Sequence, residues 1–335
     1  MKIKAAILES FKKPLLLKNI TIPPLNKGQV LVKLYYSGIC KSQLMEIEGG
    51  RNNKKYLPHM LGHEGSGIVI KTGKNVTKVK KGDEVILTWI KSKGLNCKGG
   101  SIKHINKKIN FGPITTFSNY SLISENRIVK KPKFLSRKLA TLFGCALSTG
   151  AGMILKQPKL TLNKKVLIYG LGGIGFCSLI TLLATKHKKI YVYDHNIERM
   201  KLAERMGAKK INLLENKNEY CNYFDLCIET CGKTETIENG LSLIKYNGKL
   251  IFASHPSKNK KIRIDPHELI RGKKILGSWG GSTNLEKDLG NYYKILKNKI
   301  NLFNFLTNDI YSLSQINVAL SRMKKGLTIR PLIKF

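Results

Sequence analysis

The six residues from Gly170 to Gly175 have the types and spacing that suit the binding of a pyrophosphate. They read Gly170-Leu171-Gly172-Gly173-Ile174-Gly175, a G-x-G-x-x-G pattern between the apolar run VLIYG and a second apolar stretch. The first glycine permits a tight turn, the second lets the backbone approach a pyrophosphate, and the third allows a helix to pack closely on a strand. The alternative is a glycine turn that binds no nucleotide.

An acidic residue follows at the distance that a dinucleotide site requires. Asp194 ends the next apolar run, KIYVYD. A carboxylate there would accept hydrogen bonds from the adenosine ribose and repel a 2′-phosphate. The N-terminus of the intervening helix would supply N–H donors to the phosphates. The pattern therefore predicts a dinucleotide site that favours NAD over NADP.

Cys40 raises a second chemical question. It stands in SGICKSQLMEIEGG, with no other cysteine or histidine nearby in the sequence. Such a thiol is either an unreactive core residue or one ligand of a metal site whose other members lie far along the chain. The local sequence leaves both readings open.

The elements that would position these residues fall into three parts. Up to about residue 147, short alternating runs such as QVLVKLYYSG and GSGIVIKTG predict a small, mostly antiparallel β domain. From about residue 164, strand and helix patterns alternate, which predicts a parallel sheet covered by helices on both faces. A helical stretch and a last strand, LTIRPLIKF, follow residue 279.

The charge balance is strongly basic, with 60 Lys and Arg against 21 Asp and Glu among 335 residues. A clustered excess would indicate a nucleic-acid or membrane partner. Here the lysines are spread over the whole chain, so we expect a solvated surface with no specific nucleic-acid or membrane partner. Weak, salt-sensitive association with polyanions would still follow.

The seven cysteines and the opening residues indicate the compartment. The number is odd, the chain is too long to need disulfide staples, and MKIKAAILES lacks the apolar core of a secretory leader. We therefore expect a reducing cytoplasm. The run from Leu167 to Ala184 is long enough to mimic a membrane span, but its glycines favour a strand, a turn and a buried helix.

Three segments occurring together, in order, carry a resemblance to a known family. They are LPHMLGHEGSGIVIKTGKNVTKVKKGDEVI, LFGCALSTGAG and the glycine motif, and the likeness extends to the closing TIRPLIKF. The chain resembles the zinc-dependent alcohol dehydrogenases of the medium-chain dehydrogenase/reductase superfamily. This resemblance implies an α/β fold, with a GroES-like catalytic domain (residues 1–147 and 279–335) and a Rossmann NAD-binding domain (148–278).

The resemblance assigns Cys40, His63 and Cys145 as the protein ligands of one catalytic zinc. Two thiolates and a neutral imidazole suit Zn²⁺, and three protein ligands leave a fourth position for water or substrate. Glu64 then corresponds to a carboxylate close behind the metal that can enter its coordination sphere transiently. A plain surface glutamate is the alternative.

The same resemblance implies a reaction, the reversible oxidation of an alcohol, polyol or sugar hydroxyl to a carbonyl. Zinc acts as the Lewis acid, Ser42 takes the proton of the alcohol and NAD receives the hydride. Thr149 corresponds to a residue that packs against the nicotinamide. Lys41 and Arg330 correspond to residues that bind the pyrophosphate, and Arg199 to a basic residue near the ribose. For Lys41, a solvated surface lysine is the alternative.

Two positions near Ser42 depart from the family pattern. Many relatives have a proton-relaying histidine where this chain has Met45, and an aspartate that supports the zinc-bound histidine where it has Gln43. Methionine cannot relay a proton, so either Ser42 and the cofactor ribose pass it directly to water or another group serves. Glutamine can still hydrogen-bond a histidine but brings no charge.

The loop that holds a second, structural zinc in many relatives also differs. Residues 91–113 contain one cysteine, Cys97, and one thiol cannot form a four-cysteine site, even with His104. We therefore expect no structural zinc and a loop that is mobile or part of a subunit contact. Core packing is expected of the remaining thiols, Cys177, Cys221, Cys227 and Cys231, although the last two are close enough to leave a metal reading open.

Two other functions compete with this interpretation. A zinc-free quinone or enone reductase would keep the fold without the metal, and metal analysis distinguishes it. A basic polyanion-binding protein would bind RNA at physiological salt and leave the cofactor site empty. An alcohol dehydrogenase of this family is expected to be a homodimer or homotetramer, with two cofactor-domain sheets joined edge to edge.

Overall fold

The computed structural model describes residues 1–105 and 107–335, so Asn106, in the 91–113 segment, lies outside the described residues. The chain divides into two compact units. Unit 1 comprises Met1–Cys145, Asn284–Leu289 and Asn304–Phe335, and unit 2 comprises Ala146–Thr283 and Gly290–Phe303. The second part of unit 2 falls inside the segment 279–335 that the predicted boundary assigns to the catalytic domain. As limits of functional domains, the predicted boundaries stay a prediction.

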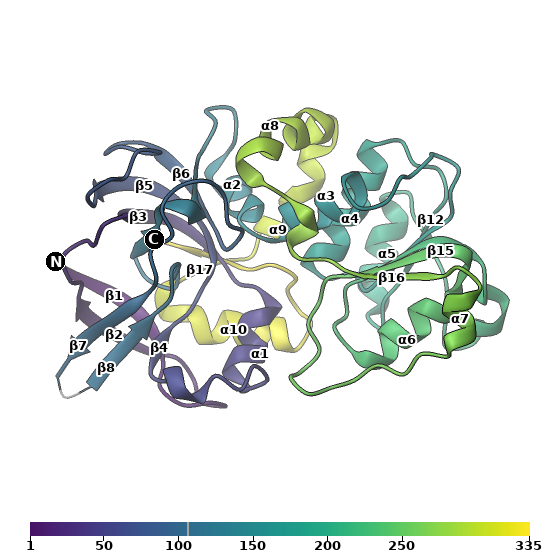
Figure 1. Cartoon of the computed structure of the whole chain (residues 1–335), viewed down its shortest axis with the longest axis horizontal. Coiled ribbons are helices and arrows are strands. Elements are labelled where there is room, and N and C mark those ends of the chain that lie inside the picture. Colours follow the sequence, from purple (N-terminus) through teal and green to yellow (C-terminus); the bar gives the residue numbers. More distant parts are fainter. Residues whose placement is uncertain (106) are drawn as a thin grey trace. The chain divides into compact units, whose positions relative to one another are not determined.

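Unit 1 is built on two sheets (Figure 1). The larger has the order β10-β6-β5-β3-β18-β17, with β9 paired to β3, and the smaller has the order β2-β1-β4-β8-β7. The strands are β1 (Lys2–Leu8), β2 (Leu16–Thr21), β3 (Gln29–Gly38), β4 (His59–Met60), β5 (Glu64–Thr72), β6 (Glu84–Thr88), β7 (Gly100–His104), β8 (Lys107–Phe111), β9 (Tyr120–Ser124), β10 (Ile128–Lys130), β17 (Ile310–Ser312) and β18 (Leu332–Lys334).

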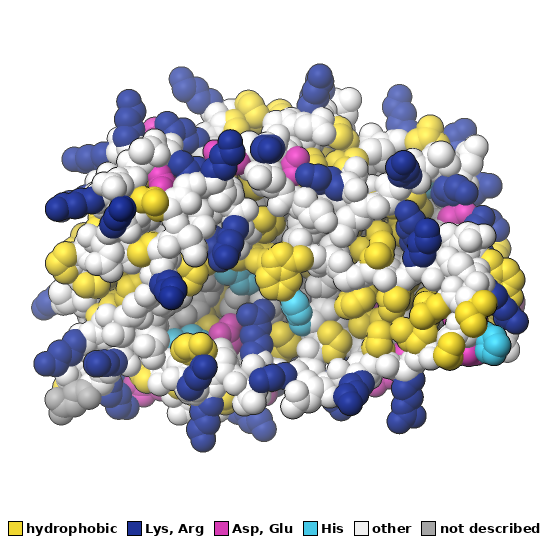
Figure 2. All heavy atoms as spheres, in the orientation of Figure 1, with side chains coloured by type: hydrophobic (Ala, Val, Ile, Leu, Met, Phe, Trp, Pro, Cys, Tyr) yellow, Lys and Arg dark blue, Asp and Glu magenta, His cyan; other side chains and the backbone are white. Residues whose placement is uncertain are grey.

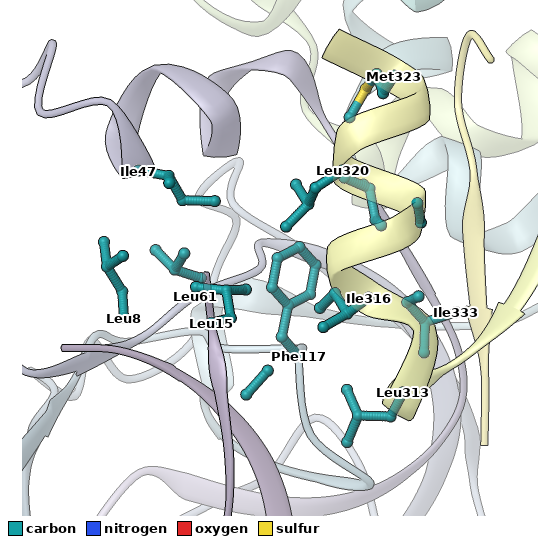
Figure 3. Packing of buried hydrophobic residues seen from close by; sticks show 13 residues of the cluster. Leu8, Leu15, Ile47, Leu61, Phe117, Leu313, Ile316, Leu320, Met323 and Ile333 are labelled. Carbon is teal, nitrogen blue, oxygen red and sulfur yellow. The ribbon is translucent and has the colours of Figure 1, made fainter. Parts of the chain in front are cut away.

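The helices of unit 1 are short and flank the sheets. They are α1 (Lys41–Ile47), α2 (Arg137–Phe143), α9 (Asn304–Thr307) and α10 (Ile316–Lys324). Figure 3 shows α10 presenting Ile316 and Leu320 to Phe117, which is fully buried, while Ile47 and Leu61 approach from the N-terminal half. This apolar cluster therefore ties the end of the chain to the segments that carry α1 and β4.

The segment 91–113, expected to be a loop that is mobile or part of a subunit contact, contains two paired strands among its described residues. β7 and β8 pair antiparallel, with Ile102 opposite Ile109. Both isoleucines are buried in a cluster with Ile3 and Phe111. Alternating apolar residues supply the buried face that a sheet needs, and the lysines between them face solvent.

Unit 2 contains a sheet with the order β13-β12-β11-β14-β15-β16, in which every pairing is parallel. The parallel sheet confirms the predicted α/β class. The strands are β11 (Val166–Tyr169), β12 (Ile190–Tyr193), β13 (Lys209–Lys210), β14 (Phe224–Glu229), β15 (Ile244–Phe252) and β16 (Lys274–Gly277). The helices are α3 (Ala146–Leu155), α4 (Gly173–Ala184), α5 (Ile197–Arg205), α6 (Thr234–Leu243) and α7 (Pro266–Ile270), and α8 (Leu285–Leu296) begins in unit 1 and ends in unit 2.

The apolar run around α4 belongs to the core of unit 2. β11 and β12 are buried along their whole length, as parallel strands covered on both faces are. Of the described helices, none alone is long and apolar enough to cross a membrane, and one bent pair, α2 with α3, passes that test only by length and composition.

The cysteines do not all follow the prediction. Cys177 and Cys227 are buried as expected, but Cys221 is exposed and Cys231 is half-buried. Cys221 follows the 3₁₀ turn Lys217–Tyr220, outside the strand that buries Cys227. The prediction of a core position for Cys221 is wrong. No disulfide joins any of the cysteines, all of which lie in the described part of the chain.

Candidate functional site

Cys40, His63 and Cys145 meet in unit 1, each at the end of a different element. Cys40 caps the N-terminus of α1 after β3, His63 immediately precedes β5, and Cys145 follows α2. One ligand atom from each residue lies within 4.8 Å of the other two. His63 Nε2 is 3.3 Å from Cys145 Sγ. This is the one group of three or more potential metal-binding side chains among the described residues.

Two glycines allow these elements to come so close. A Cβ on Gly144 would lie 2.4 Å from the Leu87 carbonyl oxygen and 2.8 Å from Glu64 Cβ. A Cβ on Gly38 would lie 2.3 Å from Glu64 Oε1. All three distances are shorter than real Cβ contacts. A side chain at Gly144 would therefore push β5 and β6 away from the end of α2, and one at Gly38 would displace the Glu64 carboxylate.

The thiols of Cys40 and Cys145 are both buried, and each shifts the pKa of the other. The hydrogen bond from Cys145 lowers the pKa of the Cys40 thiol well below its usual range; burial opposes this, and the positive charge of Arg330 adds to it. The same hydrogen bond, together with burial, raises the pKa of Cys145 well above its usual range. A lowered pKa favours the thiolate, which is the form of a cysteine that binds metals.

This donor set fits Zn²⁺. Two sulfurs and one imidazole nitrogen are the ligands of zinc sites that keep an open position, and the three atoms are close enough to share one ion. Ser42 Oγ is buried without a hydrogen-bond partner among the described residues. A buried hydroxyl without a partner is uncommon, so Ser42 indicates a polar ligand beside the cluster.

Glu64 lies behind the cluster and is completely buried. Its Oε1 is 2.6 Å from Nη2 of Arg330, which is itself only 3% exposed. The two groups are not aligned as a hydrogen bond, and neither carboxylate oxygen accepts one from a described residue. Burial, only partly offset by the positive charge of Arg330, raises the pKa of Glu64. Arg330, predicted to bind the pyrophosphate, thus has its guanidinium against Glu64.

The two departures on α1 have different surroundings. Gln43 is buried and contacts both Cys40 and His63: its Oε1 accepts the Cys40 N–H at 3.0 Å, and its Nε2 is 2.5 Å from His63 Nδ1. Met45 is followed by Glu46, whose Oε1 is 3.1 Å from His59 Nε2. Sequence reasoning missed this largely buried Glu46–His59 pair, because the two residues lie on α1 and β4 and no motif joins them.

The predicted dinucleotide turn in unit 2 has the backbone that the glycines imply. Gly170 has φ +101°, in the left-handed region, and Gly172 caps the N-terminus of α4. A Cβ on Gly175 would lie 2.0 Å from the carbonyl oxygen of Gly170, so only glycine allows this packing. Gly173 and Ile174 follow directly in the first turn of α4. The backbone N–H groups of such a first turn can donate to an anion.

Asp194 holds this turn from the end of β12. Its Oδ2 accepts the Leu171 N–H at 2.6 Å and its Oδ1 accepts the Asn196 N–H at 2.8 Å. The residue is 5% exposed. Arg199, on α5, is close enough for the Asp194 charge to oppose the lowering of its pKa by burial. Asp194 and Arg199 therefore lie close enough to interact electrostatically, and their roles at a cofactor stay a prediction.

The remaining predicted cofactor residues are dispersed over the chain. Lys41 is exposed at the first position of α1 in unit 1, and Thr149 is buried in α3 of unit 2. Sequence reasoning missed Thr230, whose Oγ1 donates to the Gly170 carbonyl at 2.7 Å. Thr230 directly follows β14, and the carboxyl end of a parallel strand beside the glycine turn was the available signal.

Comparisons with known proteins identify the family. Residues 26–133 match the model of the alcohol dehydrogenase GroES-like domain, and residues 173–297 match that of the zinc-binding dehydrogenases. The chain belongs to the zinc-containing alcohol dehydrogenase family of the medium-chain dehydrogenase/reductase superfamily. It is therefore an oxidoreductase with the GroES-like and Rossmann-type architecture that the resemblance implied.

Full-length relatives support the assignment to the zinc-containing alcohol dehydrogenases. The chain is 26% identical to an S-(hydroxymethyl)glutathione dehydrogenase of Synechocystis, with both proteins covered completely. It is also 26% identical to an alcohol dehydrogenase class-3 of Drosophila melanogaster, which covers 99% of this chain and 97% of that protein. Benzyl alcohol dehydrogenase from Acinetobacter calcoaceticus superposes with a TM-score of 0.88 at 25% identity, covering 100% of this chain and 99% of that one.

Proposed function

We propose that this enzyme oxidises an alcohol, polyol or sugar hydroxyl reversibly to a carbonyl, with NAD as the hydride acceptor and one zinc held by Cys40, His63 and Cys145. The proposal rests above all on these three side chains, whose ligand atoms lie within 4.8 Å of one another. A zinc ion held there supplies a Lewis acid that makes an alcohol hydroxyl more acidic, and NAD supplies the hydride acceptor.

The chain's own residues supply the binding and the proton acceptor. The Ser42 hydroxyl is buried beside Cys40 and has no hydrogen-bond partner among the described residues; it is proposed to take the alcohol proton. Glu64, with its negative charge offset by Arg330, places a carboxylate behind the ligands. Met45 cannot relay a proton. Beyond Ser42, the alcohol proton therefore passes through the cofactor ribose, water or another group.

Asp194 is proposed to select NAD. Its two oxygens each accept one backbone N–H, and a carboxylate oxygen has a second lone pair for a ribose hydroxyl. Its charge would repel a 2′-phosphate. We also propose the predicted roles of four other residues. Arg199 lies near the ribose, Thr149 packs against the nicotinamide, and the pyrophosphate is bound by Lys41 and Arg330. Titration of the protein with NADH and NADPH, followed by fluorescence, compares the two affinities directly.

A dimer joined through the parallel sheets is proposed as the assembly. β16 is one edge of the sheet of unit 2, and Leu276 on it is 39% exposed. Figure 2 shows hydrophobic side chains gathered over this strand and α7, where Leu269 and Ile270 are also exposed. An exposed apolar edge strand is a natural pairing surface. Sedimentation velocity distinguishes monomer, dimer and tetramer.

The central experiment combines metal analysis with an activity screen. NAD reduction is measured over simple alcohols, polyols and sugar derivatives, with and without a chelator. We expect one zinc per chain and an activity that the chelator removes. In Cys145→Ser, zinc affinity and NAD reduction should each fall by at least about a hundredfold. The matched variant Cys97→Ser, outside the cluster, should keep both the zinc and the activity. Metal-free protein with full activity would contradict the proposal and favour the zinc-free reductases.

Ser42→Ala tests the proton acceptor separately. A positioned general base contributes about 10²- to 10⁴-fold, so kcat should fall by at least about a hundredfold at unchanged zinc content. Near-normal turnover would mean that the proton leaves by another route. The Glu46–His59 pair, which begins one helical turn beyond Ser42, would then be the next position to substitute.

A further inference from the structure

Gln43 forms two hydrogen bonds at the candidate zinc site, and both involve predicted ligands. Its side chain is 3% exposed and occupies the first turn of α1. Oε1 accepts the backbone N–H of Cys40 at 3.0 Å, and Nε2 lies 2.5 Å from Nδ1 of His63. The other ring nitrogen, Nε2 of His63, lies 3.3 Å from Cys145 Sγ.

The backbone N–H of Cys40 fixes the donor and acceptor in each of these hydrogen bonds. A backbone N–H only donates, so the amide side that faces Cys40 must be the oxygen. The amide nitrogen therefore faces His63 and donates to Nδ1. A neutral imidazole that accepts at Nδ1 carries its proton on Nε2. That proton points to Cys145, so the three bonds run in one direction from Cys40 N–H to the Cys145 sulfur.

Binding of zinc by His63 needs the opposite arrangement. The nitrogen beside Cys145 must offer a lone pair, so the proton must be on Nδ1 and must be donated to an acceptor. Gln43 presents a donor there. If the amide turns over, its oxygen accepts from His63, but its nitrogen then faces the N–H of Cys40. In either orientation, one donor faces another donor.

We propose that Gln43 is a positioning residue that holds His63, in the metal-free protein, with its proton on Nε2, so that zinc loading breaks one of the two Gln43 hydrogen bonds. A carboxylate would accept from Cys40 and from His63 at the same time. Gln43 thereby weakens the zinc site relative to the same site with an acid at this position. This inference rests on the proposed zinc ligands.

Zinc affinity gives the first test. Gln43→Glu keeps the length of the side chain and replaces the donor by an acceptor. Competition with a chromogenic chelator at fixed pH should show zinc bound about tenfold or more tightly, within the range by which such partners of a ligand change metal affinity.

The matched control is Lys41→Gln. It changes the net charge by the same unit and lies next to Cys40, but its exposed side chain is outside the Gln43–His63 contact. An exposed charge at this range is screened, so its effect should stay below about fivefold. Equal effects of the two substitutions would mean that charge alone acts, and would overturn the inference.

The tautomer of His63 gives a second test that needs only the natural protein. Two-bond ¹H–¹⁵N correlation spectra of the zinc-free protein, with His63 assigned by comparison with His63→Asn, should show the proton on Nε2. After zinc is added, the proton should be on Nδ1. In zinc-free Gln43→Glu it should already be on Nδ1. A proton on Nδ1, or on both nitrogens, in the zinc-free natural protein would overturn the inference.

The two tests separate this inference from the proposed function. If zinc binds but leaves the His63 signals unchanged, His63 is not a ligand and both proposals fail. If zinc changes the His63 signals but the zinc-free protein already carries the proton on Nδ1, the zinc site stands and the role of Gln43 falls.

Discussion

Glu125 and Glu64 are two glutamates buried in the same unit, 1% and 0% exposed, and their surroundings differ completely. The Glu125 carboxylate accepts three backbone N–H groups, from Thr77 at 2.6 Å, Lys78 at 2.9 Å and Leu95 at 2.7 Å. Glu64 accepts no hydrogen bond from any described residue and faces the guanidinium of Arg330.

The pKa values of the two carboxyls follow from this difference. Burial would raise the pKa of Glu125, but the N–H groups of Leu95, Lys78 and Thr77 outweigh it, and the pKa is lowered. For Glu64 burial prevails and the pKa is raised. Directed backbone donors thus stabilise a buried carboxylate more completely than one buried cation does. Glu125 holds two loops, those of Thr77 and Leu95, whereas Glu64 keeps lone pairs available beside the candidate zinc site.

The largest effect should come from removing the Arg330 guanidinium that faces Glu64. Arg330→Met leaves a buried carboxylate without its cation, which costs about 3–5 kcal/mol of unfolding free energy in comparable cases. Adding Glu64→Gln should recover most of this loss, because the buried charge disappears. Urea denaturation of zinc-free protein measures both variants. A double variant as unstable as Arg330→Met would show that Arg330 acts through its packing.

A somewhat smaller loss is expected at Glu125. Glu125→Gln replaces one acceptor oxygen by a donor that faces a backbone N–H, which should cost about 2–3 kcal/mol. No second substitution can restore it, because the partners are backbone groups, and activity per folded molecule should not change. The exposed control Glu48→Gln removes only the surface pair with Lys324 and should cost below about 1 kcal/mol. Equal losses of unfolding free energy in Glu125→Gln and Glu48→Gln would show that the backbone N–H groups do not stabilise the Glu125 carboxylate.

The smallest effect is the pH dependence that Glu125 contributes. Because its folded-state pKa is lowered, its stabilisation is fully present above the unfolded value, about 4.3, and is lost as the pH falls through the folded value. Urea midpoints between pH 7 and pH 3 should therefore fall less steeply in Glu125→Gln than in the natural protein. Parallel curves would show that Glu125 titrates alike in the folded and unfolded chains.

The sequence predicted the glycine turn well because its pattern is local. The spacing of Gly170, Gly172 and Gly175, followed by Asp194, fixes a strand, a turn and a helix within one short segment, and the structure has all three. The spacing could not indicate that Asp194 also accepts the Leu171 N–H, or that Thr230 donates to Gly170. Those contacts depend on which strands become neighbours.

The candidate zinc ligands could be recognised in the sequence only through the resemblance to the family. His63 and Cys145 are 82 positions apart, and no periodicity links them. Glu125 had no motif at all, and its role appears only when the loops of Thr77 and Leu95 fold against it. The prediction for Cys221 was wrong because an apolar neighbourhood in the sequence does not show whether a residue lies within a buried strand or in the exposed segment before it.

The sequence by itself determined the family, the order of its two architectures and the glycine turn, because these follow from motifs and from hydrophobic patterns read along the chain. Only the tertiary structure decided what each buried polar group faces. Gln43 faces both Cys40 and His63, Glu64 faces Arg330, and Glu125 faces three backbone N–H groups. Desolvation makes each of these partners decisive, and partners are chosen by packing between segments far apart in the chain.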